Sequence, residues 1–115
     1  MTKTYRIKLD FAAAHFLPGY KGLCETLHGH TFLVEFYVTV PKELDPVGIG
    51  YDFKWLKKKL KSILPDHTCL NEEYEIHPTA EHIVDHLYRD AQKWVDVEKV
   101  VLWESEGSGI EVSNR

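Results

Sequence analysis

Three histidines near the start of the chain have the types and spacing of a metal site. His28 and His30 are two positions apart, and alternate residues of a β-strand share a face, so both imidazoles are expected on one side. His15 follows an alternating apolar run and can reach the same side from a neighbouring strand. Three neutral imidazoles without a fourth protein ligand are typical of catalytic zinc, which keeps one coordination position open. The pattern predicts a metal site, and the alternative is that the three are unrelated polar residues.

Cys24 is the second chemical feature of this stretch, four residues before His28 in an expected loop. A nearby cation or imidazolium lowers the pKa of a thiol and raises its thiolate fraction, which would make Cys24 a general base or nucleophile. The alternative is a small buried hydrophobic residue. A disulfide with Cys69 is open from the sequence, but it would consume this thiol, and in the cytoplasm, where we expect the protein, both cysteines should be reduced.

Three residues in the second half of the chain could transfer protons or bind a substrate. Asp66 and His67 are adjacent, and in an irregular loop the acid can orient and charge the imidazole. Glu104 follows Trp103 at the end of an expected strand, where a carboxylate can accept paired hydrogen bonds from a guanidine-like heterocycle edge. The alternatives are a surface Asp-His dipeptide and a plain charge at a strand end.

Length and composition indicate one globular domain spanning 1–115. Hydrophobic residues make up 43% of the 115 positions and charged residues 28%, which excludes a disordered chain. A formal net charge of −4 argues against a nucleic-acid binder that neutralises phosphates. We see neither a charged leader followed by an apolar run nor an apolar segment of about 18 residues, so we expect no signal peptide and no membrane span.

The hydrophobic pattern predicts an α+β domain with six elements. Asp52 is the expected cap of the first helix, and Thr79 or His77 that of the second. A four-stranded antiparallel sheet with both helices on one face is the simplest arrangement of these elements. Its outer strands would be open edges, which pairing with another subunit would cover. The expected order is strand, strand, helix, helix, strand, strand, at 5–11, 28–40, 53–64, 78–96, 99–103 and 110–112.

These motifs resemble the 6-pyruvoyltetrahydropterin synthase family, including its 6-carboxytetrahydropterin synthase branch. The Cys-x-x-x-His-Gly-His motif is specific, whereas Pro-Thr-x-Glu alone would be weak. The spacing of Cys24 and His28 is the one associated with the carboxy-forming branch. Gly50 and Ser105 depart from the usual residues, a branched aliphatic and a threonine, and neither touches the proposed chemistry. The matching stretches run in family order over nearly the whole chain, at 11–15, 24–30, 48–53, 66–71, 78–81 and 103–105.

The resemblance implies a T-fold and a set of site residues. Subunits of that family assemble edge to edge into barrels, as trimers or dimers of trimers, with active sites at subunit interfaces. Zinc would bind three histidines, and Cys24 would be the catalytic thiol. Asp66 and His67 would be a proton-relay pair contributed by a neighbouring subunit. Glu104 would anchor the pterin ring. The implied zinc ligands are His15, His28 and His30, and the implied residues lining the pterin pocket are Thr79 and Glu81.

The resemblance also implies a reaction. The chain would be a zinc-dependent lyase that eliminates triphosphate from 7,8-dihydroneopterin triphosphate. The product would be 6-pyruvoyltetrahydropterin or, after further side-chain cleavage, 6-carboxytetrahydropterin, a precursor of deazapurine nucleosides in tRNA. The alternatives are another T-fold pterin enzyme, such as a dihydroneopterin aldolase or epimerase, and a non-catalytic pterin-binding module.

Overall fold

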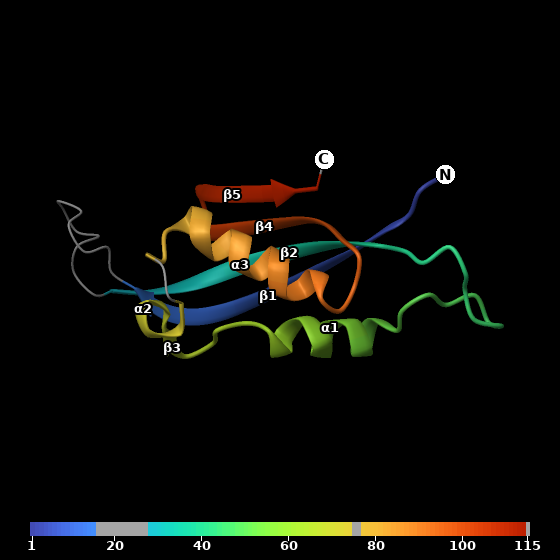
Figure 1. Ribbon diagram of the computed structural model, residues 1–115, viewed down its shortest axis with the longest axis horizontal. Helices are drawn as coiled ribbons and strands as arrows, with labels where there is room; N and C mark the ends of the chain where they lie inside the picture. The colour runs from blue at the N-terminus through green and yellow to red at the C-terminus, as the bar shows by residue number, and fades with distance from the viewer. Residues whose placement is uncertain (16–27, 75–76, 115) are drawn as a thin grey trace.

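Two long strands form the centre of the sheet in the computed structural model, which describes residues 1–15, 28–74 and 77–114 (Figure 1). β1 (Thr4–His15) and β2 (His28–Thr39) are antiparallel and stay in register over twelve residues each. Within the described residues, the sheet has five strands in the order β3-β1-β2-β4-β5. The other elements are α1 (Phe53–Ser62), β3 (Thr68–Cys69), α2 (Leu70–Glu73), α3 (Ala80–Gln92), β4 (Val97–Ser105) and β5 (Ser108–Ser113).

The core lies on one face of this sheet, beneath the helices. Alternate residues of each strand turn to that face, so β1 and β2 bury every second side chain there. Helices α1 and α3 contribute side chains at helical spacing to the same cluster, which confirms the prediction that both cover one face. The largest fully buried side chains are Phe11, Phe32, Phe36, Ile7, Leu56, Leu60, Leu70, Ile83, Leu87 and Leu102.

The two long helices begin at the predicted caps. Asp52 accepts a hydrogen bond from the backbone N–H of Lys54 at 3.4 Å, and Thr79 accepts one from that of His82 at 3.2 Å. Each cap satisfies a backbone N–H group that has no partner within its own helix. The start of α3 is thus fixed at Thr79 rather than at His77. α1 ends at Ser62 and α3 at Gln92, two and four residues before the predicted ends.

The segment predicted as a plain loop at 66–77 holds two short elements. β3 adds two residues in parallel to β1, with Thr68 opposite Ala13 and Cys69 opposite Ala14. α2 is a single turn that buries Leu70 completely. A two-residue strand has no periodicity to read from sequence, and only pairing with β1 defines it. No helix in the described ranges is long and apolar enough to cross a membrane.

Strand β4 departs from regular pairing once toward each of its ends. Against β2, Tyr37 pairs with Lys99 but Val38 pairs with Val97, so Glu98 is an extra residue. A second register shift, in the pairing with β5, lies between Trp103 and Ser105, next to Glu104. Such bulges bend a strand and redirect its side chains.

Candidate active site

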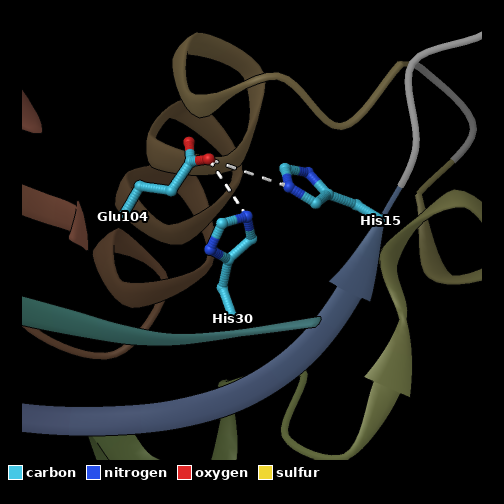
Figure 2. A group of neighbouring side chains, drawn as sticks. All are labelled: His15, His30 and Glu104. Carbon is cyan, nitrogen blue, oxygen red and sulfur yellow. Dashed lines mark ion pairs between the residues drawn. The ribbon is translucent and has the colours of Figure 1, made fainter. Parts of the chain in front are cut away.

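His15, His30 and Glu104 converge at the end of the sheet where β1 and β4 finish (Figure 2). Oε1 of Glu104 lies 3.2 Å from Nε2 of His30 and 4.0 Å from Nε2 of His15. One ligand atom from each of the three residues lies within 4.8 Å of the others. The His15 side chain is almost completely buried, whereas those of His30 and Glu104 are 24% and 31% exposed. The group is therefore a cluster of metal-ligating atoms in which the Nε2 atoms of both imidazoles are buried.

The strand register explains why the two imidazoles meet. His30 is opposite Ala13, and His15 is opposite His28, so positions 15, 28 and 30 fall on one face of the β1–β2 pair. The rings of His15 and His30 are 5.0 Å apart between centroids and nearly perpendicular, at 78°. The side chain of His28 lies outside the described part of the chain. Its role as third ligand stays a prediction that the backbone register accommodates.

The tautomer of His15 is set by the start of α3. Its Nδ1 lies 2.9 Å from the carbonyl oxygen of Pro78, the residue before the cap Thr79. A carbonyl oxygen can only accept a hydrogen bond, so Nδ1 carries the hydrogen. In the neutral ring, Nε2 then has the lone pair, and Figure 2 shows this nitrogen directed toward Glu104. A backbone acceptor behind the second nitrogen is the usual support of a metal-binding histidine. No sequence pattern indicates this contact, because it depends on where α3 docks.

A hollow of about 240 Å³ lies beside Glu104, between the start of α3 and the β4–β5 turn. Glu81 and Glu104 both line it, so the structure brings together two of the three residues predicted to contact the pterin. Ser108 and Gly109 line it as well, and sequence reasoning missed both because they read as part of a turn. Thr79 directly precedes Ala80, which lines the hollow, but the hydroxyl oxygen of Thr79 accepts the capping hydrogen bond of α3.

Asp66 and His67 form a pair outside the histidine cluster, next to the β3 edge of β1. Oδ2 of Asp66 is 3.1 Å from Nδ1 of His67, and Oδ1 accepts a hydrogen bond from the backbone N–H of Ala12 at 2.8 Å. The hydrogen bond from Ala12 is the main reason why the pKa of Asp66 is lowered; desolvation opposes it, and the nearby His67 lowers the pKa further. His67 is held at φ 58°, and its side chain is 83% exposed. The pair is therefore ordered by its own subunit while its imidazole faces outward.

Of the two cysteines, only Cys69 lies within the described residues. Cys24 lies outside the described residues, so its predicted place beside the metal stays a prediction. Cys69 is described, and it is a free, half-buried cysteine in β3.

Comparison with known proteins gives one consistent result. The sequence profile of the family described as 6-pyruvoyl tetrahydropterin synthase matches residues 4–115. A protein of Archaeoglobus fulgidus provisionally named 6-carboxy-5,6,7,8-tetrahydropterin synthase is 37% identical over 109 residues, which cover 92% of this chain and 91% of that protein. The 6-carboxy-5,6,7,8-tetrahydropterin synthase of Bacillus subtilis is 33% identical over 96 residues, 76% of this chain and 64% of that protein.

A solved structure supports the fold independently. The 6-pyruvoyl tetrahydropterin synthase of Caenorhabditis elegans superposes with a TM-score of 0.84 at 22% identity, over 100% of this chain and 97% of that one. At this identity the likeness shows the fold alone, and it confirms the predicted T-fold.

Proposed function

Because this chain belongs to the 6-pyruvoyl tetrahydropterin synthase family, we propose that it is a zinc-dependent lyase acting on 7,8-dihydroneopterin triphosphate. Membership itself makes the chain a lyase of the tetrahydropterin synthase type. The proposal adds the metal, the substrate, and the product, 6-carboxytetrahydropterin or 6-pyruvoyltetrahydropterin. The observation that carries it is the approach of the His15 and His30 imidazoles to the carboxylate of Glu104, which also lines a hollow.

His15, His28 and His30 would hold the zinc. The donor chemistry fits, because imidazole nitrogens bind zinc at about 2.0–2.1 Å and the Nε2 atoms of His15 and His30 lie close enough to share one ion. The contact from Pro78 keeps Nε2 of His15 in the form that can donate a lone pair. When bound, zinc would supply Lewis acidity to the side-chain hydroxyls of the substrate.

Glu104 would bind the pterin rather than the metal. The amino-pyrimidine edge of a pterin presents neighbouring N–H groups, and a carboxylate can accept two of them in parallel. Glu104 stands at the hollow that Glu81 also lines, which is where such an edge would enter. In the alternative, Glu104 itself completes a two-histidine, one-carboxylate metal site. The two arrangements differ in which variant loses zinc.

Proton transfer would involve Cys24, His67 and Asp66. Cys24 would be the base that moves a side-chain proton, and His67, charged and oriented by Asp66, would return it. His67 faces outward in its own subunit, so we propose that it serves the active site of a neighbouring copy in a trimer or a dimer of trimers. The outermost strands of the sheet, β3 and β5, are the edges through which copies would pair. Triphosphate would leave by elimination, and internal redox would reduce the pterin ring.

The decisive experiment is one incubation of the zinc-loaded protein with 7,8-dihydroneopterin triphosphate. Released triphosphate should appear in parallel with 6-carboxytetrahydropterin or 6-pyruvoyltetrahydropterin, identified by mass spectrometry. Absence of triphosphate release, or full activity in a chelator that has removed all metal, would overturn the proposal. Cleavage of unphosphorylated dihydroneopterin instead would indicate an aldolase-type T-fold enzyme. Binding of pterin without any turnover would indicate a non-catalytic module.

A further inference from the structure

The Glu104 carboxylate stands at an irregularity in the sheet. Trp103 pairs with Gly109 and Ser105 with Ser108, so two residues of β4, Glu104 and Ser105, face one residue of β5. This is a β-bulge, in which the extra residue bends its strand and alters the direction of the side chain there. The direction of the carboxylate therefore depends on how firmly the strand is held next to the bulge.

Trp103, the residue before the bulge, is tied to β2 on the face away from the helices. Its indole Nε1 donates a hydrogen bond of 2.9 Å to Oε1 of Glu35. The side chain of Glu35 is only 13% exposed, and its second oxygen lies 3.8 Å from Nζ of Lys8. An indole has a single N–H donor, so this bond fixes the rotation of the ring as well as its position.

The indole ring of Trp103 also packs against β5, where it lies over Gly109. A Cβ atom on Gly109 would lie 2.6 Å from Cε3 and 2.8 Å from Cδ2 of Trp103. Both distances are shorter than real Cβ contacts, and a rigid indole cannot yield locally as a flexible chain would. The indole therefore covers the bare backbone of Gly109, and any other residue there would displace it.

We propose that Glu35, Trp103 and Gly109 are positioning residues for Glu104. They hold the strand immediately before the bulge, and so they direct the carboxylate toward His15, His30 and the hollow. The inference rests on the proposed function where it assigns pterin binding to Glu104. Of the three, Gly109 lines the hollow itself.

The test uses the full-length, zinc-loaded protein and substitutions at all three positions. Trp103→Phe keeps an aromatic ring but removes the donor, and Gly109→Ala forces the ring away. The affinity for oxidised neopterin, a non-reacting probe, should fall about 3- to 10-fold in Trp103→Phe, the range expected for losing one hydrogen bond that fixes the geometry. KM for dihydroneopterin triphosphate should rise by a similar factor, whereas zinc content should stay that of the wild type. Glu35→Gln, which keeps an acceptor for the indole, should restore most of the affinity that Glu35→Ala loses.

Crystal structures of the variants separate this inference from the proposed function. The 3.2 Å approach of Glu104 to His30 should lengthen in Trp103→Phe and Gly109→Ala. An unchanged approach, together with unchanged neopterin affinity, would overturn the positioning role. If even the wild type fails to bind neopterin, the proposed function fails, and the Glu104–His30 distance in the variants still decides the positioning role. If Gly109→Ala does not fold, Trp103→Phe alone decides. The control is Glu98→Gln, at the other bulge of β4, which should leave neopterin affinity unchanged.

Discussion

The two ends of β4 carry the same side chain at the same kind of backbone irregularity, yet they differ in what surrounds it. Glu98 is the extra residue in the pairing with β2, and Glu104 lies at the bulge facing β5. The Glu98 carboxylate accepts hydrogen bonds from the hydroxyls of Thr4, at 3.1 and 3.2 Å, and of Thr39, at 3.0 Å. Both glutamates border a hollow, but Glu104 faces two imidazoles instead of hydroxyls.

This difference separates a carboxylate used for stability from one available for binding. The threonine hydroxyls come from β1 and β2, so Glu98 joins three strands through donors of its own subunit. The neighbours of Glu104 are imidazoles, which are groups that bind metals. A bulge alone therefore does not make a glutamate functional. The neighbouring side chains decide its role, and four experiments test this contrast.

Removing a proposed zinc ligand should have the largest effect. His28→Ala should lose bound zinc and with it all measurable lyase turnover, because a catalytic site needs its three protein ligands. Metal analysis of the purified variant checks the first part and product detection the second. His86→Ala is the matched control, since His86 stacks on Tyr74 outside the proposed zinc set and should leave zinc content unchanged. If Glu104→Gln loses zinc while His28→Ala retains it, the two-histidine, one-carboxylate arrangement is correct.

Removing the proposed base should come next. Cys24→Ala should keep the fold and the zinc but lower turnover by about 10²- to 10⁴-fold, the usual contribution of a general base. Stopped assays with dihydroneopterin triphosphate measure this loss. Cys69→Ala, which removes the other cysteine, should retain turnover. Retained turnover in Cys24→Ala would exclude the thiol as the base.

Neutralising each glutamate in turn tests the comparison directly. Glu104→Gln should lower kcat/KM about 100-fold, because a hydrogen bond to a charged group contributes about 1.5–3 kcal/mol, and should leave the unfolding temperature nearly unchanged. Glu98→Gln should do the reverse, lowering the free energy of unfolding by about 1 kcal/mol while activity stays at the wild-type level. Thermal unfolding and steady-state kinetics on both variants suffice. Equal losses of activity in Glu104→Gln and Glu98→Gln would show that the two ends of β4 do not differ in function.

The smallest effect should come from the charge of Asp66. Its pKa in the folded chain lies below the ordinary value of 3.8, so the ionised group stabilises the fold above that value. The contribution is lost as the pH falls through the lowered pKa. The advantage in stability of the wild type over Asp66→Asn should thus be present at pH 6 and shrink below about pH 4. Urea unfolding at both pH values measures it, and a difference independent of pH would contradict the assignment.

Sequence reasoning predicted the features that depend on neighbouring residues. Alternation identified the first long strand, and β-branched and aromatic residues identified the second, which put His28 and His30 on one side. Asp52 and one of the two candidate caps, Thr79, marked the helix starts. These signals are local, because a strand repeats every two residues and a cap acts within one turn. The T-fold itself came from the resemblance of the motifs in their order along the chain.

The remaining features required the tertiary structure. β3 is defined only by its pairing with the edge of β1. The two bulges of β4 are defined by its pairing with β2 and β5. The contact from Pro78 to His15 and the approach of Glu104 to the imidazoles depend on how α3 and β4 meet β1 and β2. Residue types and their spacing alone were enough to identify which groups can do the chemistry and which strand positions share a face. Only the folded chain decided which of them touch, because register and helix docking are set by contacts between distant segments.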